Sequence, residues 1–379
     1  MERIKIKNIC EVNPKQEILD DNFIISFIGM AQISNDNQFD TSILKKYEDV
    51  KKGFSSFKDG DILFAKITPC MENGKGVLIE NLYNGIGFGS TEFHVLRPNI
   101  KVVDKKYLYW FTMYKKFRLN CEKNMTGSAG QKRVPKNYIE NYEIKLPELI
   151  IQEKRAKILD NILKIKQEKL EQLKRLEELN KSIFIEMFGD PIKNEKKWKL
   201  EKMLVVAPIQ QSIKISKEMV WLLNLDGIES ETGKIIKYEK KLFKEIEKNS
   251  IISFNEENVL YSKLRPYLNK VVIPEEEGYG TSELLPLKPD KNKIKRIFLA
   301  NLLRTKSFVN YVNNKTIGAK MPRVSTKEIM NFNCIIPPIE LQNSFAERIK
   351  MIEKSKVEIQ KSIEETQKLF DSLMEKYFG

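Results

Sequence analysis

The side chains best suited to contact another molecule are hydroxyl and basic residues that occur in two similar sets. The first set is Lys66, Thr68, Ser90, Thr91, Lys132 and Arg133, and the second is Lys263, Arg265, Thr281, Ser282, Lys320 and Arg323. Hydroxyl groups and Lys or Arg side chains on loops are the types that contact nucleic-acid phosphates and base edges. Ordinary strand caps and surface charges are the alternative for any one of them. Their duplication, together with a net charge of +14, favours a nucleic-acid surface in each half of the chain.

Patterns typical of a self-sufficient enzyme are missing from the sequence. No [DNS]-P-P-[YF] tetrapeptide, which amino-methyltransferases use to hold the target amine, occurs. Neither Gly74-Lys75 nor Gly233-Lys234 is followed by the Ser or Thr of a phosphate-binding loop. His94, the one histidine, has no nucleophile or carboxylate at a recognisable spacing, and we interpret it as a half-buried strand residue. We therefore expect no catalytic residue in this chain.

The spacing of the cysteines and the hydropathy pattern indicate whether the chain could bind a metal ion and where in the cell it is expected. The four cysteines lie far apart without a C-x-x-C pair, so we expect no metal site and reduced thiols. An apolar N-terminal h-region and a run of 18 apolar residues are both absent from the sequence. We accordingly expect a cytoplasmic protein with no membrane partner.

The sequence contains an internal repeat. Residues 61–69 align with 258–266, and 89–93 align with 280–284. At a shift of 190 residues, five more positions match: Thr126, Ala129, Arg133, Val134 and Pro147 with Thr316, Ala319, Arg323, Val324 and Pro337. The collinear order predicts a tandem duplication in which each copy is a globular domain followed by a long helix. The expected divisions are 1–147, 148–189, 190–337 and 338–379.

Two segments without internal Pro or Gly, Leu149 to Phe188 and Ile339 to Phe378, each predict one uninterrupted helix. In the second, apolar residues recur in a clean heptad. In the first, we take as the buried stripe Ile158, Ile162, Ile165, Lys169, Leu173, Leu176, Asn180, Ile183 and Met187, which has one irregular step. We expect the two helices to pair antiparallel as a spacer, with four exposed leucines that bind partner helices: Leu159, Leu163, Leu170 and Leu179.

The predicted fold class is α+β, with two similar mixed α/β domains separated by two long antiparallel coiled-coil helices in a pseudo-twofold repeat. In the first domain, short strands are expected at 23–30, 60–67, 76–80 and 92–96. An aromatic-rich helix is expected at 107–119, with a counterpart at 297–312.

This organisation, with three local motifs, resembles the DNA-specificity (S) subunit of type I restriction-modification systems. The motifs are Gly60-Asp-Ile-Leu-Phe64, Thr126-Gly-Ser-Ala-Gly130 and Pro337-Pro338-Ile339-Glu340-Leu341-Gln342. The last is similar to the family's Pro-Pro-Leu-x-Glu-Gln pattern with Leu341 in place of Glu, and the first copy, Pro147 to Gln152, departs further. The resemblance covers essentially the whole chain.

The resemblance implies that each domain is a target-recognition domain for one half of a bipartite sequence in double-stranded DNA. It further implies two methyltransferase (M) subunits docked on the helices, with restriction (R) subunits as additional partners. The chain itself is then non-catalytic and without a cofactor, and S-adenosylmethionine belongs to the methyltransferase subunit. One alternative is a specificity subunit of a modification-only or other phage-defence methyltransferase. An alternative of another class is a coiled-coil scaffold that binds protein or RNA.

Overall fold

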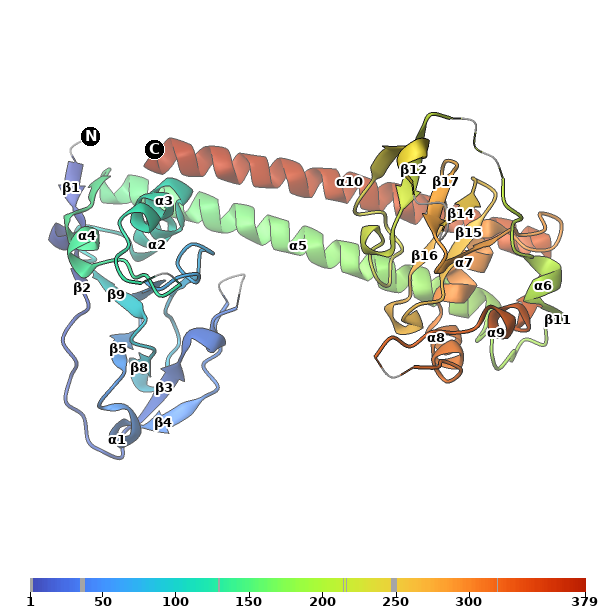
Figure 1. Ribbon diagram of the computed structural model, residues 1–379. Coiled ribbons are helices and arrows are strands. Elements are labelled where there is room, and N and C mark those ends of the chain that lie inside the picture. Colours follow the sequence, from blue (N-terminus) through green and yellow to red (C-terminus); the bar gives the residue numbers. More distant parts are fainter. Residues whose placement is uncertain are drawn as a thin grey trace. The chain divides into compact units, whose positions relative to one another are not determined.

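The structure is a computed structural model that describes residues 3–34, 38–128, 130–213, 215, 217–246, 251–318 and 320–379. It forms two compact units: unit 1 comprises Met1–Lys169 with Ser362–Gly379, and unit 2 comprises Leu170–Lys361. Each unit therefore contains a globular part and segments of two 40-residue helices, α5 (Leu149–Phe188) and α10 (Ile339–Phe378) (Figure 1). Ala129 and Ala319, which contributed to the predicted repeat, lie outside the described residues.

Unit 1 is built on two four-stranded sheets and a two-stranded one. The strand orders are β4-β3-β8-β5, β2-β9-β6-β7 and β1-β10, and β3 and β8 are parallel. The strands are β1 (Arg3–Lys5), β2 (Cys10–Val12), β3 (Ile24–Ile28), β4 (Leu44–Lys46), β5 (Ser55–Lys58), β6 (Ile62–Ala65), β7 (Gly76–Leu78), β8 (Ile86–Gly89), β9 (Phe93–Pro98) and β10 (Glu143–Lys145). The shorter helices are α1 (Tyr47–Val50), α2 (Lys105–Met113), α3 (Lys115–Lys123) and α4 (Lys136–Asn141).

Unit 2 repeats this plan. Its sheets have the orders β13-β12-β17-β14, β16-β15-β18 and β11-β19, and β12 and β17 are again parallel. The strands are β11 (Lys199–Lys202), β12 (Met219–Leu223), β13 (Glu239–Leu242), β14 (Ile251–Phe254), β15 (Val259–Ser262), β16 (Val271–Val272), β17 (Gly278–Thr281), β18 (Leu284–Leu287) and β19 (Asn333–Ile336). The shorter helices are α6 (Met203–Val206), α7 (Arg296–Arg304), α8 (Lys306–Asn313) and α9 (Thr326–Met330). The shared topology confirms the predicted α+β class and the internal repeat.

The aromatic-rich helix of each unit differs from the prediction. Instead of one helix at 107–119, unit 1 has α2 and α3, separated by Tyr114 in an extended conformation with ψ 123°. Unit 2 breaks at Thr305, with ψ 142°, between α7 and α8. The Thr305 hydroxyl accepts a hydrogen bond from the Phe308 backbone N–H, which caps α8. Helical periodicity alone does not reveal such a break because the apolar face continues through it.

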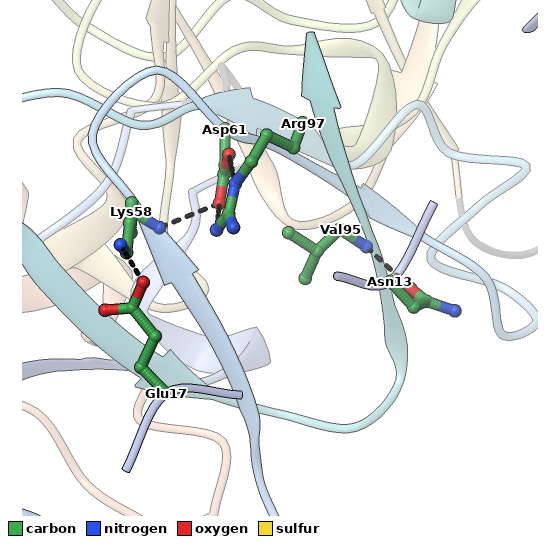
Figure 2. Close-up of polar contacts among 6 residues, drawn as sticks. All are labelled: Asn13, Glu17, Lys58, Asp61, Val95 and Arg97. Atoms are coloured by element: carbon green, nitrogen blue, oxygen red, sulfur yellow. Dashed lines mark hydrogen bonds and ion pairs between the residues drawn. The ribbon is translucent and has the colours of Figure 1, made fainter. Parts of the chain in front are cut away.

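The Gly60-Asp-Ile-Leu-Phe64 motif shapes the entry to β6. Asp61 is buried, accepts a hydrogen bond from the Lys58 backbone N–H at 2.8 Å, and forms a two-bond ion pair with Arg97 at 2.9 and 2.7 Å (Figure 2). At the entry to β15, Asn258 accepts the same kind of bond from the Asn255 backbone N–H at 2.8 Å. An Asx side chain at this position closes the turn before a fully buried strand, which explains why both copies have one.

A buried glutamine fixes the start of each long helix. Gln152 donates to the Pro147 carbonyl at 2.8 Å and accepts from the Asp104 backbone N–H at 2.9 Å. Gln342 makes the equivalent bonds, to the Pro337 carbonyl at 2.9 Å and from the Lys295 backbone N–H at 2.8 Å. The Pro-to-Gln motif thus joins the helix start to the loop before α2 or α7.

The two long helices confirm the predicted bounds, but the buried stripe of α5 is partly different. Ile158 and Ile165 are exposed, whereas Leu159 and Lys166 face inward. The stripe is therefore Leu159, Ile162, Lys166, Lys169, Leu173, Leu176, Asn180, Ile183 and Met187. This register removes the irregular step and places every member 190 residues before a stripe residue of α10.

Within each unit, α5 and α10 run antiparallel. In unit 1, Arg155 contacts the Tyr377 carbonyl at 3.3 Å, and Lys169 donates to the Ser362 and Thr366 hydroxyls at 2.6 and 3.1 Å. In unit 2, Phe184 and Phe188 both pack on Phe345. Residue numbers rise along α5 as they fall along α10, as predicted. The ammonium group of Lys169 is accommodated in the stripe because two hydroxyls accept from it.

Candidate nucleic-acid interface

The predicted polar and basic residues of unit 1 come together where β6 and β8 end and β9 begins. The Lys66 backbone N–H donates to the Glu92 carbonyl at 2.9 Å, and the Thr68 backbone N–H donates to the Lys132 carbonyl at 3.0 Å. The loop that carries Lys132 is closed by mutual backbone bonds between Thr126 and Arg133 at 3.0 and 2.8 Å. We call this arrangement of 66–68, 90–92, 126–128 and 130–133 site 1.

Unit 2 has an equivalent arrangement at the ends of β15 and β17. The Lys263 backbone N–H donates to the Glu283 carbonyl at 2.9 Å, and the Arg265 backbone N–H donates to the Pro322 carbonyl at 2.7 Å. Thr281 is the last residue of β17, and Ser282 lies in the turn between β17 and β18. We call the arrangement of 263–265, 281–283, 316–318 and 320–323 site 2. Residues distant in sequence are thus brought together twice in the same way.

An arginine–glutamate pair joins two loops of each site. In site 1, Arg133 donates from Nε and Nη2 to the two carboxylate oxygens of Glu92, both at 2.9 Å. In site 2, Arg323 donates to Glu283. The two glutamates were missed as site residues, although the repeat alignment already places Glu92 on Glu283. A paired carboxylate neutralises the guanidinium and fixes its direction, so both arginines stabilise their loops in addition to any contact they make outside.

Several predicted hydroxyl groups also have partners inside the protein. Thr68 donates to Glu72 at 2.6 Å. Ser90 accepts from the Glu92 backbone N–H at 3.1 Å, and Thr281 accepts from the Glu283 backbone N–H at 3.4 Å. The Ser90 and Thr281 hydroxyls thus stabilise the turns that carry Glu92 and Glu283. The members of the two sets that are exposed are Thr91, Lys132, Arg265, Ser282, Lys320 and Arg323.

Burial and pairing shift the ionisation of site 1. Burial lowers the pKa of the half-buried Lys66, and the nearby Arg133 acts in the same direction, against the opposing effect of Glu92. The hydrogen bonds from Arg133 lower the pKa of Glu92. At neutral pH the glutamate is therefore charged, and it partly offsets the two cations beside it.

His94 holds the backbone that follows Arg133 in site 1. It lies buried on β9, and its Nε2 is 2.8 Å from the carbonyl of Val134, the residue after Arg133. Its Nδ1 is 3.1 Å from the amide nitrogen of Asn13. Because a carbonyl can only accept and an amide NH2 can only donate, the ring is neutral with the proton on Nε2. Burial lowers the pKa of His94 to about 4. The side chain is more buried than the sequence suggested, and its position in unit 2 is taken by Leu285.

The leucines predicted to bind partner helices divide into two groups. Leu159 is fully buried in the core of unit 1, and Leu163 packs against the same core, so the prediction of exposure is wrong for these two. The error follows from the displaced stripe at the start of α5. Leu170 and Leu179 are 42% and 46% exposed and remain candidates for a partner surface.

Two classes of feature are absent from the part of the chain that the structure describes. No group of three or more His, Cys, Asp or Glu side chains is arranged to hold a metal ion. None of the helices there has the length and apolar character to cross a membrane.

The sequence is similar to known specificity proteins. Residues 1–180 match the family model for the type I restriction modification DNA specificity domain. The type I restriction enzyme EcoAI specificity subunit of Escherichia coli is 47% identical over 152 residues, which are 39% of this chain and 26% of that protein. The EcoEI specificity subunit of the same organism is 45% identical over 148 residues, 38% of this chain and 25% of that protein. The chain thus matches about a quarter of the length of these relatives.

The fold resembles solved structures over the whole chain. A chain from a structure that describes complex assembly and conformational transition of the type I R-M system has a TM-score of 0.66 at 15% identity, covering 99% of this chain and 97% of that one. The type I restriction-modification system S subunit from M. genitalium has a TM-score of 0.58 at 15% identity, covering 100% and 96%. At this identity the likeness establishes the fold alone. The match to the family model covers residues 1–180, somewhat less than half of the chain, so it is this first half that is similar to the type I restriction modification DNA specificity domain.

Proposed function

We propose that the chain is the specificity subunit of a type I restriction-modification complex and that it reads a bipartite sequence in double-stranded DNA. Site 1 would read one half of the target and site 2 the other. The chain itself is non-catalytic in this proposal: it determines where the complex acts on DNA, and its partners perform the chemistry.

The observation that carries the proposal is the pair of equivalent sites with different exposed side chains. Both are assembled from the same strand ends and the same arginine–glutamate pair. Their tips differ, because Gly127 and Gln131 of site 1 correspond to Ile317 and Met321 of site 2 at a shift of 190 residues. Two scaffolds of one kind with different contact residues suit two different half-sequences, since base edges are read by specific side chains.

The partners follow from the same proposal. Two methyltransferase subunits, which hold S-adenosylmethionine, would dock on α5 and α10, and restriction subunits would join them. The exposed Leu170 and Leu179 of α5 are the side chains that we assign to this docking surface.

The proposal predicts a steep and site-dependent response to salt. Binding of Lys and Arg to DNA phosphates releases counterions, so log K falls with log[salt] by about 0.9 for each phosphate neutralised. Replacement of the exposed Lys132 and Lys320 by alanine should therefore reduce the slope by up to about 1.8 in the double variant. The measurement is fluorescence anisotropy with a labelled DNA duplex, using the chain co-produced with its methyltransferase subunit, across a range of KCl concentrations.

Lys51 provides a matched control. It is paired with Asp21 at 2.8 Å and belongs to neither site, so Lys51→Ala should leave the slope unchanged. A salt response that is flat in the unsubstituted complex would contradict DNA binding through these surfaces. Binding of RNA or protein without a shift of duplex DNA would favour the coiled-coil scaffold alternative.

A further inference from the structure

In site 2, residues 317–318 and 320–323 belong to a short hairpin whose paired ends are Ile317 and Arg323. Ile317 and Arg323 exchange backbone hydrogen bonds at 2.9 and 3.0 Å, and Arg323 is also bridged to Leu264 at the end of β15. The Arg323 guanidinium donates to Glu283, in the turn after β17. The Arg323 end of the hairpin is thus fixed to two strand ends, and we call its two exposed apolar residues, Ile317 and Met321, the apolar tip.

The tip has an unusual composition for a surface loop. Ile317 is 79% exposed and Met321 is 56% exposed, next to the exposed cations Lys320 and Arg323. A single exposed apolar residue is ordinary on a protein surface. Here two large apolar side chains lie within one hairpin of five residues between its paired ends, among the basic residues of site 2.

The corresponding loop of site 1 shows that the shared fold does not require an apolar tip. Gly127 and Gln131 stand where unit 2 has Ile317 and Met321. The site 1 loop closes between Thr126 and Arg133, so it has one more residue between its paired ends than the hairpin of site 2. The apolar tip is thus particular to site 2, which points to the ligand of that site and not to folding.

We propose that the Ile317–Arg323 hairpin enters the major groove of the half-site bound by unit 2 and that Ile317 and Met321 contact a thymine methyl group there. The inference rests on the proposed function and adds to it the kind of base that one site reads. The major groove is wide enough for an α-helix or a two-stranded ribbon, so a short loop closed by one backbone pair has room there, and the thymine 5-methyl is the apolar group on the base edges of that groove. Lys320, beside Met321, is placed to bind the adjacent phosphate.

The test removes the methyl group from the DNA and the apolar tip from the protein. The full chain, co-produced with its methyltransferase subunit, is first used to establish the methylated sequence. Duplexes with that sequence are then made with deoxyuridine in place of each thymidine in turn. The double variant Ile317→Ser/Met321→Gln and the single variant Met321→Gln are compared with the unsubstituted complex. The control is Ile236→Gln, an exposed apolar residue of unit 2 outside site 2.

The unsubstituted complex and the control should lose affinity about fourfold at a thymine position in one half-site only, the amount expected for one buried methyl group. The double variant should bind the thymidine and deoxyuridine duplexes equally well and still co-purify with the methyltransferase subunit. Equal binding of all duplexes by the unsubstituted complex, or unchanged discrimination in the double variant, would overturn the inference. Loss of co-purification in the double variant would also overturn it, because the tip would then be a protein contact. If the unsubstituted complex shows no preference for its methylated sequence, the proposed function fails instead.

Discussion

Replacement of Phe188 by alanine should lower the free energy of unfolding by about 3–5 kcal/mol, the range for a large aromatic side chain removed from a core. Phe188 is fully buried near the end of α5. Its ring centroid lies 4.7 Å from that of Phe298, 5.3 Å from Phe345 and 5.1 Å from Phe184. This cluster joins α5, α7 and α10 in unit 2, so its loss should loosen the attachment of both long helices to the sheet. Urea unfolding followed by circular dichroism measures the change.

The neighbouring Ile185 serves as the matched control on the same helix turn. It is 45% exposed, and Ile185→Ala should change the unfolding free energy by less than about 1 kcal/mol. Equal effects of the two substitutions would mean that the helix face assigned to the core of unit 2 is wrong.

The second large effect is a dependence of stability on pH through His94. Burial holds the pKa of His94 at about 4 in the folded protein, against 6.5 for the unperturbed side chain. Between these values the unfolded chain binds a proton that the folded chain does not, so stability rises with pH across this window. The contribution is fully present above pH 6.5 and is lost as pH falls toward 4, by about 3 kcal/mol in total.

The variant His94→Leu, which introduces the residue found at this position in unit 2, tests this dependence. Unfolding free energies of the two proteins should be measured by urea titration at intervals from pH 7.5 to 4.5. The variant loses the hydrogen bonds to Val134 and Asn13 and should be less stable at pH 7.5. Its stability should nevertheless fall less steeply below pH 6.5, because the chain has no other histidine to take up a proton on unfolding. The part of the fall that remains comes from the carboxylates. Parallel pH profiles for the two proteins would show that His94 is not held neutral by burial.

The sequence was sufficient for the features that depend on repetition and periodicity. The bounds of α5 and α10 follow from the absence of Pro and Gly and from the flanking Pro and Gly residues. The equivalence of the two units follows from collinear matches such as 61–69 with 258–266. The buried stripe of α5 was less certain, because Ile158 and Leu159 are both apolar and only packing decides between them. The internal repeat would have identified the correct stripe, since Leu159 and Lys166 align with the stripe residues Ile349 and Lys356 of α10.

The candidate sites show a similar division. The types and positions of Lys66, Lys132 and Arg265 could be identified from the duplicated pattern, and the structure brings each set together. Which of these groups are already paired could not be predicted. The bonds from Arg133 to Glu92 and from Thr68 to Glu72 depend on how strand ends meet, and sequence spacing does not determine that geometry. Sequence alone therefore could not separate the charged residues that support a site from those that remain exposed.

If two sites of one chain read the two halves of a DNA target, the pattern of methylation must depend on the gene, and methylome sequencing with and without the gene is the decisive experiment. The strain should carry the chain together with its methyltransferase subunit. We expect N6-methyladenine in a motif of two specified half-sequences separated by unspecified bases, and its disappearance when the gene is deleted. Substitutions in site 2 should alter one half-sequence and leave the other unchanged. A single contiguous motif, or a methylome that does not depend on the gene, would contradict the account.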